Sequence, residues 1–364
     1  MKRLRLSNLL WILPGGIALA LGWLLPRHPA VAEKVFAEGL FRLIAVPMGW
    51  LTSLIPLSLT ELALILALPA AVLLAVRLVR RLRRGGRRRA IARLLRTAAW
   101  LVSILFAVYM VMHGLNFARP PVSELMGLDT RPQTVEYLAA VCRDLAKQAS
   151  AERARLPEDE NGRIRDERST VDLLRQAETG FRAAGRDCDL LWGGTWQPKP
   201  VRLSHWWSYT GITGMYFPFF AEANVNVDVP VFDIPFTAAH ELAHTRGFAR
   251  EDECNFIAWL TCLYQDDPLY RYSGQLMAYL YCENALKAYD NDLRWQIRDT
   301  CSEAVQRDLQ LQHDYWAAFE GEVQQVSTEV NDAFLTVQGE EDGVFSYDRV
   351  VALIMAYYQT KIWP

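Results

Sequence analysis

Long uncharged runs separated by basic segments make up the first third of the chain. Three of them, at about 9–25, 54–76 and 97–117, are almost wholly apolar, and only Glu61 interrupts the second. A helix needs roughly 20 apolar residues to cross the hydrocarbon core of a bilayer. The pattern therefore predicts three membrane-spanning helices within residues 1–118, which would form a membrane anchor.

Arginine dominates the segment between the second and third runs. Ten of the 20 residues from 77 to 96 are arginine, and short loops of this kind stay on the cytoplasmic side of a membrane. We therefore predict that this loop and the N-terminus are cytoplasmic and that residues 119–364 form an extracytoplasmic domain. Pro120-Pro121 marks the boundary, because consecutive prolines cannot continue a helix.

Two features of the first 50 residues allow alternative interpretations. The first apolar run is followed by Ala30-Val31-Ala32, so a cleaved signal peptide is the alternative to a membrane span. Residues 30–50 carry four charged side chains among apolar ones. They fit a helix that lies in the membrane interface, and they fit an ordinary connecting helix equally well.

The pattern of apolar positions changes after residue 118. Helical signals occur at 132–150 and 169–184, and they dominate the chain from residue 234 to a last helix at 346–363. Residues 224–229 instead alternate strictly between polar residues and valine, which predicts a strand with the valines buried. We therefore expect a mainly α protein, in which three membrane helices precede an α+β domain with a small sheet.

Charge and cysteine content refine this division. The net charge is only −2, but the anchor is rich in arginine whereas the remainder is acidic. The basic residues lie beside apolar spans, where they set topology, so the composition indicates the lipid bilayer as a partner and not nucleic acid. All six cysteines lie beyond residue 118, where disulfides and free buried thiols are equal alternatives.

The strongest chemical signal in the chain is His240-Glu241-x-x-His244. Histidines four residues apart lie on one face of a helix, so both imidazoles can bind a single Zn²⁺. Glu241 lies between them, where its carboxylate can act as general base toward a metal-bound water. Such a water is acidic enough to be a nucleophile near neutral pH. The alternative is a surface helix with two solvated histidines.

A third ligand is expected just beyond a glycine turn. Gly247 permits the chain to reverse after the first helix. In the metzincin pattern a third histidine would follow, but Arg250 occupies that position and a permanent cation cannot bind zinc. We predict Glu251 as the third ligand, with Glu253 as the second choice. Asn255, one turn after Glu251, is placed to orient one of the histidines.

Several stretches resemble known families. Glu-x-x-x-Asn after the histidine helix is similar to the Glu-x-x-x-Asp signature of gluzincins. More closely, the chain resembles a bacterial membrane family catalogued as a domain of unknown function, number thirty-eight ten, among the zincin-like peptidases. The stretches that carry this resemblance are 209–219, 222–226, 235–244, 246–258 and 342–351.

The resemblance implies a zincin fold, a bacterial cell membrane location and a metallopeptidase activity, but no particular substrate. In zincins the strand before the active helix pairs with extended substrate along a free edge. By resemblance this strand is 224–229, and Asn224 and Asn226 on its polar face become candidate substrate-binding residues. The alternative is an ordinary half-buried strand.

Other polar residues are candidates for a role in the same chemistry. The oxyanion of a tetrahedral intermediate needs a hydrogen-bond donor, and the candidates are Tyr270, Tyr272, Tyr279, Tyr281 and His313. Taken singly, we expect each of them to be a core or rim residue. We expect a structural role for His205 and an interfacial position for His113 at the end of the third span.

Two hypotheses follow from the sequence. The first is a membrane-anchored zinc metallopeptidase that cleaves a peptide or protein of the cell envelope outside the membrane. His240, His244 and Glu251 would bind the metal, and Glu241 would serve as general base. The second is a non-catalytic sensor or scaffold stapled by zinc, with Cys254 or His205 as a fourth ligand that closes the site.

Overall fold

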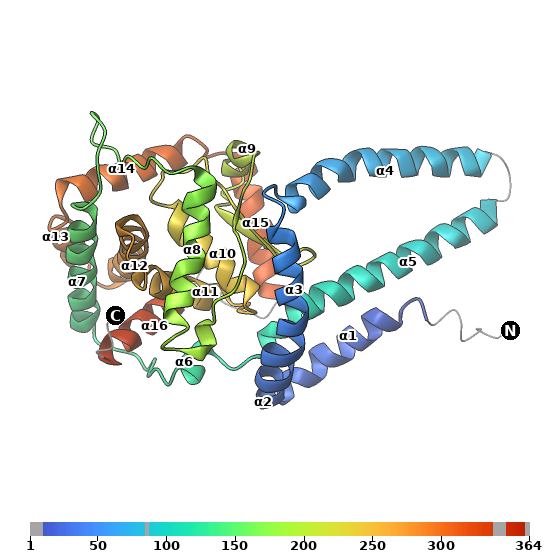
Figure 1. Cartoon of the computed structure of the whole chain (residues 1–364), viewed down its shortest axis with the longest axis horizontal. Coiled ribbons are helices and arrows are strands. Elements are labelled where there is room, and N and C mark those ends of the chain that lie inside the picture. The colour runs from blue at the N-terminus through green and yellow to red at the C-terminus, as the bar shows by residue number, and fades with distance from the viewer. Residues whose placement is uncertain (1–9, 84–86, 338–346, 361–364) are drawn as a thin grey trace.

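The computed structural model describes residues 10–83, 87–337 and 347–360. Figure 1 shows two regions, a narrow projection and a broad helical body. The projection consists of α1 (Leu13–Leu24), α4 (Leu59–Arg83) and α5 (Arg87–Met112). The described residues are mainly helical, with one small sheet of three strands, in agreement with the predicted mainly α class.

Among the described residues, three helices are long and apolar enough to cross a membrane: Pro29–Ser53, α4 and α5. The last two contain most of the predicted spans at 54–76 and 97–117. The predicted loop at 77–96 is wrong in form, because both helices extend into it and only 84–86 lie outside the described residues. Arginine is a good helix former, so a basic segment can continue a helix.

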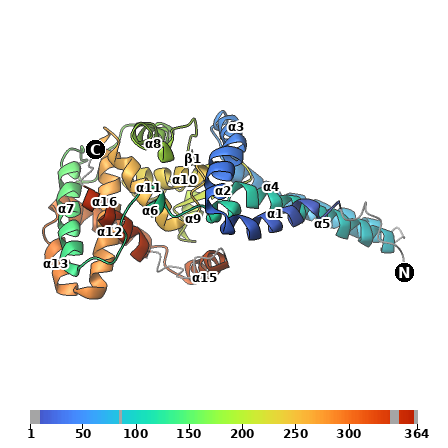
Figure 2. The ribbon, with the colours of Figure 1, turned by 90° about the horizontal axis from the view of Figure 1, so that it is seen from below.

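The first predicted span, 9–25, overlaps α1, but this helix has 12 residues and is not one of the three helices that are long enough to cross a membrane. Residue 9 at the start of the predicted span lies outside the described residues. α1 lies along α5, where the Gly15 backbone N–H donates to Ser103 Oγ at 2.9 Å. The segment Pro29–Ser53 instead runs across the base of the projection (Figures 1 and 2). This crossing orientation is typical of a helix in the membrane interface. The segment comprises α2 (Pro29–Val31), η3 (Ala32–Phe41) and α3 (Arg42–Ser53).

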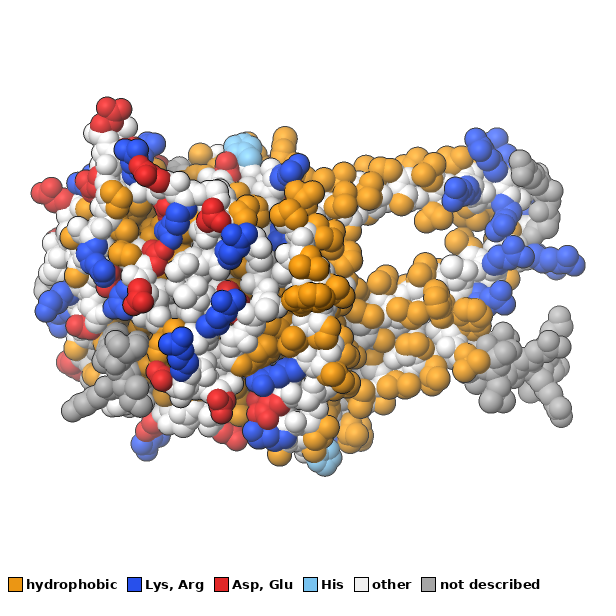
Figure 3. Space-filling view, viewed as in Figure 1, with side chains coloured by type: hydrophobic (Ala, Val, Ile, Leu, Met, Phe, Trp, Pro, Cys, Tyr) orange, Lys and Arg blue, Asp and Glu red, His pale blue; other side chains and the backbone are white. Residues whose placement is uncertain are grey.

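Side-chain character changes along the projection (Figure 3). Its sides are covered by apolar side chains, whereas Lys and Arg gather at the tip that is farthest from the body. Arg80, Arg81 and Arg83 lie in the last turn of α4, next to that tip. The body carries both acidic and basic side chains. The projection therefore has the composition of a membrane hairpin with a basic tip.

The body is built around two buried helices, α10 (Ile234–Thr245) and α11 (Glu251–Leu263), which pack on each other.

The six cysteines, all within the described residues, are free thiols. The predicted helices at 132–150, 169–184 and 346–363 appear as α7, α8 and α16, with 346 and 361–363 outside the described residues. The other body helices are η4 (Gly114–Ala118), α6 (Val122–Leu125), α7 (Val135–Arg153), α8 (Thr170–Ala184), η5 (Asp189–Leu191), α9 (Ser204–Ser208), α12 (Pro268–Tyr289), α13 (Asn291–Arg298), α14 (Glu303–Ala317), α15 (Glu322–Val337) and α16 (Tyr347–Thr360).

The sheet has the strand order β1-β3-β2. β1 (Lys199–Pro200) is parallel to β3 (Glu222–Val225), and β2 (Gly214–Phe217) is antiparallel to it, with Met215 opposite Asn224. The strand predicted at 224–229 is thus displaced to 222–225. Because β3 is the central strand, it has no free edge, and the edge beside α10 belongs to β2.

A buried ion pair joins the start of α4 to this sheet. The Glu222 carboxylate accepts hydrogen bonds from Thr60 N at 2.9 Å and Thr60 Oγ1 at 2.8 Å, and it pairs with Lys199. Lys199 Nζ also donates to the carbonyls of Thr52 at 2.8 Å and Leu57 at 3.1 Å. The Lys199 and Glu222 side chains are both buried, with 2% and 0% of their surface exposed. The buried ion pair is thus hydrogen-bonded to Thr52, Leu57 and Thr60 of the anchor region, which packs the anchor and the body together at this junction.

We predict that Glu222→Ala lowers the free energy of unfolding by about 3–5 kcal/mol, because it leaves the Lys199 ammonium buried without its carboxylate. Thermal or denaturant unfolding of the full chain in detergent would measure this change. Asp129→Asn, which removes an exposed ion pair with Arg131, serves as the control and should leave the transition unchanged. Equal free energies of unfolding for the two variants would show that this buried ion pair contributes little to the stability of the chain.

Candidate metal centre

The chain reverses sharply between the two central helices. α10 ends at Thr245, and Gly247 then takes a φ of +79°, in the left-handed region that favours glycine. α11 begins at Glu251. A Cβ at position 247 would also press on the Asn116 side chain and the Phe41 ring. Glycine at this turn is therefore required by both backbone conformation and space.

Residues next to the anchor clamp the turn. Arg119 Nη1 donates to the Gly247 carbonyl at 2.8 Å, while the same guanidinium makes a bidentate pair with Glu33 at 2.7 and 2.8 Å. Arg250 Nη2 donates in return to the carbonyls of Phe117 and Arg119, both at 2.9 Å. Arg250 occupies the position of the third histidine in metzincins. Here its side chain holds the segment next to the anchor by hydrogen bonds.

The turn brings three potential ligands together. The Nε2 atoms of His240 and His244 are 3.2 Å apart, and Glu251 Oε2 lies 3.1 Å from His240 Nε2. Glu251 Oε1 lies 3.5 Å from His244 Nε2. Donor atoms around a tetrahedral Zn²⁺ with bonds of about 2.0–2.1 Å are about 3.3 Å apart. The three donor groups therefore fit such an ion.

The other ring nitrogens are held by acceptors. His240 Nδ1 is 2.8 Å from Asn255 Oδ1, and His244 Nδ1 is 2.9 Å from the Phe248 carbonyl. An acceptor at Nδ1 fixes the proton there and leaves the Nε2 lone pair directed at the cluster. The contact from Asn255 is the one predicted from its position one turn after Glu251.

Glu241 lies against the edge strand β2. A Cβ at Gly214 would overlap the Glu241 carboxylate, so the glycine leaves the space in which this side chain lies. The Tyr216 backbone N–H donates to the carboxylate, whereas Glu241 Oε2 is buried and has no hydrogen-bond partner among the described residues. One oxygen of the expected general base is thus left available. Burial raises the pKa of Glu241 to about 8.

Charge pairing within the cluster opposes the effects of burial. Burial by itself disfavours the charged form of His240, but its hydrogen bond to Glu251 and the nearby carboxylates raise its pKa to about 9. Burial likewise disfavours ionised Glu251, yet the two histidines lower its pKa to about 2. For His244 burial is the largest influence, and its pKa is lowered. Pairing with the histidines thus favours the ionised form of Glu251, which is the form that can bind a metal.

Two aromatic side chains that the sequence did not single out for this role adjoin the cluster. The Tyr216 ring stacks on His244 with centroids 6.0 Å apart, and its hydroxyl donates to the Met112 carbonyl at 3.1 Å. The His113 ring is 5.9 Å from the His244 ring. Met112 is the last residue of α5. His113 was expected only to lie at the membrane interface, and no spacing pattern connects it to the distant histidine motif.

The structure does not bring every predicted residue to the cluster. Glu253 Oε1 accepts from Val122 N at 2.9 Å and Arg250 Nη1 at 3.0 Å, so this carboxylate supports the anchor-proximal segment instead. Glu251 alone of the two acidic candidates faces the histidines.

The predicted substrate-binding amides are buried away from the cluster. Asn224 bonds to Ser58 and Thr60 of the anchor at 2.5 and 3.1 Å. Asn226 donates to Ser208 Oγ at 3.0 Å. The polar side of the strand is therefore covered by the anchor and α9, and these side chains are not placed to contact substrate.

The remaining candidates lie elsewhere. His205 is exposed and pairs with Asp228 at 2.9 Å. Tyr270 and Tyr272 are buried, with their hydroxyls bonded to the Leu173 carbonyl and to Asp308, while Tyr279 and Tyr281 are also buried and His313 is exposed. These positions agree with core and rim roles, and no oxyanion donor is assigned among them.

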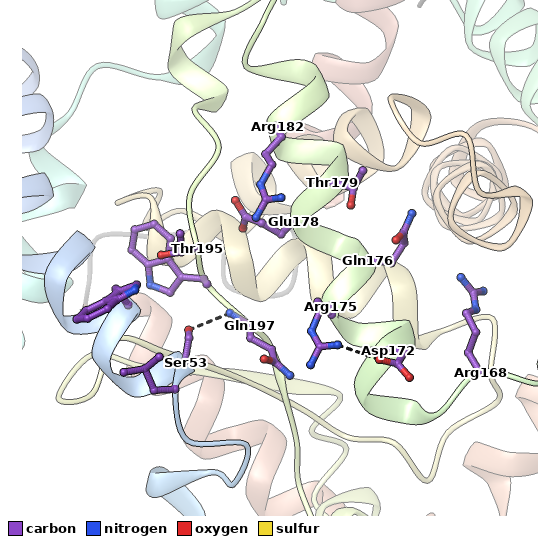
Figure 4. A pocket seen from close by; sticks show the side chains of 13 residues that line it. Ser53, Arg168, Asp172, Arg175, Gln176, Glu178, Thr179, Arg182, Thr195 and Gln197 are labelled. Atoms are coloured by element: carbon purple, nitrogen blue, oxygen red, sulfur yellow. Dashed lines mark hydrogen bonds and ion pairs between the residues drawn. The ribbon is translucent and has the colours of Figure 1, made fainter.

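A separate hollow of about 550 Å³ opens between α3 and α8 (Figure 4). Its charged lining includes Arg168, Arg175 and Arg182. Arg175 pairs with Asp172 at 2.9 Å, and Arg168 pairs with neighbouring aspartates. None of the lining residues belongs to the metal-ligand cluster. The hollow lacks the convergent donor atoms of a catalytic site, so we place the functional site at the cluster.

We predict that Glu251→Ala abolishes zinc binding, because it removes one of three convergent ligands, and that Glu253→Gln retains one zinc per chain. Elemental analysis of the purified full chain in detergent measures this directly. Zinc retained by the Glu251 variant and lost by the Glu253 variant would reverse the assignment of the third ligand.

Comparison with curated proteins and with solved structures yields no match. A family model described as "Protein of unknown function (DUF3810)" matches residues 36–355. This range runs from the helix at the base of the projection to the last helix of the body and includes the whole metal-ligand cluster. The chain therefore belongs to the DUF3810 family.

Proposed function

We propose that this chain is a membrane-anchored, zinc-dependent peptidase with a zincin-like active site. The observation that carries the proposal is the convergence of His240, His244 and Glu251 at separations suited to tetrahedral zinc, with Glu241 beside them. The Glu251 side chain is 34% exposed, so the cluster is open to water on that side.

Zinc bound by these three ligands would supply an acidic water and polarise a substrate carbonyl. The carboxylate of Glu241 is suited to receive a proton at its free Oε2 as the water oxygen bonds to the carbonyl carbon. The same carboxylate then gives this proton to the amine nitrogen as the carbon–nitrogen bond breaks. Asn255 and the Phe248 carbonyl keep both imidazoles oriented throughout.

The edge strand β2 is the element best placed to pair with an extended substrate. It lies beside α10 and contributes Gly214 and Tyr216 to the surroundings of the cluster. Backbone pairing along a free strand edge is a common way to hold a peptide. This assignment replaces β3, which is central in the sheet.

We propose that the basic tip of the projection is cytoplasmic and that the body is extracytoplasmic. Arginine-rich connections remain on the cytoplasmic side, and the tip is opposite the body (Figure 3). The proposal gives a multi-pass protein of a bacterial cell membrane that acts on peptides or proteins of the cell envelope.

The alternative of a zinc-stapled sensor needs a fourth protein ligand. Among the described residues, the convergent group has three members. Cys254 Sγ lies 3.3 Å from His244 Nδ1, the ring nitrogen that points away from the cluster. The other candidate, His205, is exposed and pairs with Asp228. A fourth position left for water favours the catalytic proposal.

Glu241→Gln should lower peptide hydrolysis by about 10²–10⁴-fold, because it removes the general base, and should leave zinc bound. The assay uses the full chain with zinc, a mixture of quenched fluorescent peptides and a set of membrane-tethered reporter polypeptides. Hydrolysis by the Glu241 variant at the wild-type rate would refute the mechanism.

Gly214→Ala should reduce turnover by about 100-fold with zinc retained, because its Cβ displaces the Glu241 carboxylate by about 1 Å. Gly321→Ala is the control, since a Cβ there meets no atom within 4 Å. Full activity of the Gly214 variant would mean that the position of Glu241 against β2 does not matter for turnover.

A further inference from the structure

The metal-ligand cluster lies at the very end of a membrane helix. Met112 is the last residue of α5, and its carbonyl accepts the hydrogen bond from Tyr216, whose ring stacks on His244. The next residue, His113, contacts His244 directly. The height of the site above the membrane is therefore set by how far α5 extends through it.

The lengths of the spans place this end close to the bilayer. In α5, 16 uncharged residues separate Arg96 from His113, a helical length of about 24 Å. In α4, 15 uncharged residues separate Glu61 from Arg77, or about 22 Å. The hydrocarbon core is about 30 Å thick. With the arginines at the cytoplasmic surface, both helices reach the body before they have cleared the opposite side.

The surface of the body at this level is suited to a membrane interface. Apolar side chains continue without a break from the projection onto the adjoining end of the body (Figure 3). The backbone N–H of Leu203, directly before α9, donates to the Glu61 carboxylate of α4 at 2.7 Å. On α9 itself, the Trp206 side chain is 66% exposed. Trp and Tyr prefer the headgroup level of a bilayer. Other exposed side chains of this kind are Tyr209, Leu203, Trp50, Leu51 and Leu43.

These observations place the cluster within the interfacial layer. The Glu61 carboxylate can lie at this depth in the membrane, because it accepts hydrogen bonds from Arg202 N at 3.1 Å and Leu203 N at 2.7 Å and does not depend on water for them. A soluble protein would have to enter the headgroup region to reach the cluster. A polypeptide that emerges from the same membrane already holds a segment there, at a high effective concentration.

We propose that the substrate is a membrane-anchored polypeptide, hydrolysed in the segment that directly adjoins its own membrane span. This inference rests on the proposed peptidase function and narrows its substrate class. Water is added across the peptide bond, so that the acyl carbon gains hydroxyl and the amine nitrogen gains hydrogen. The distal part of a substrate, far above the membrane, lies out of reach.

The test uses the full chain in phospholipid vesicles with three reporters that carry the same short randomised segment. In the first, the segment directly follows a single membrane-spanning helix. In the second, a Gly/Ser spacer of roughly 30 residues intervenes, which moves the segment away by about 30 Å. In the third, the segment is a free peptide. The first two share the same tether, so they differ only in distance from the bilayer.

We expect the directly tethered segment to be cleaved at least about 10-fold faster than the spaced one, in keeping with the effective concentration gained at the surface, with cleavage sites located by mass spectrometry. Glu241→Gln is run beside the wild type. Equal Glu241-dependent cleavage of all three reporters would overturn the substrate class and leave the peptidase function standing. No Glu241-dependent cleavage of any reporter would refute the peptidase function itself.

Discussion

The left-handed turn at Gly247 is the constraint on which the metal centre depends. Two histidines on α10 supply two of the three convergent donor groups, and the third comes from Glu251, the first residue of α11. The chain must reverse within a few residues for Glu251 to meet the histidines, and a side chain at position 247 would oppose this by strain and by overlap. Arg119 holds the turn by donating a hydrogen bond to the Gly247 carbonyl, and Glu33 neutralises the charge of Arg119.

Electrostatics links this turn to the rest of the molecule. The buried pair Arg119–Glu33 joins the body to the anchor region. The buried pair Lys199–Glu222 lies within the sheet of the body and hydrogen-bonds to residues 52–60 of the anchor region. Buried charges are costly unless they are paired and hydrogen-bonded. Here each pair receives hydrogen bonds or ionic contacts from both regions, so the two pairs hold the anchor and the body together.

Local spacing made part of this arrangement predictable. The i,i+4 histidines, the glycine turn, Glu251 as the first acidic residue of the next helix and Asn255 one turn later all follow from helix geometry over a short stretch. The roles of His113, Gly214 and Tyr216 do not, because they depend on contacts between segments far apart in the sequence. The alternation at 224–229 indicates a strand but not what covers its polar side, and segment 52–60 and α9 bury Asn224 and Asn226. The arginine content of 77–96 predicts on which side of a membrane the segment lies but not its backbone conformation, and arginine favours helix.

The contacts of Met112 and His113 with the body also bear on how far the body depends on its anchor. Shedding of the body by cleavage near residue 119 would remove the partner of Tyr216 and separate Glu33 from Arg119. A released body would then lack groups that pack around its own histidine cluster. The anchor is thus part of the folded unit that surrounds the cluster, so simple domain shuffling could not replace it with another membrane segment.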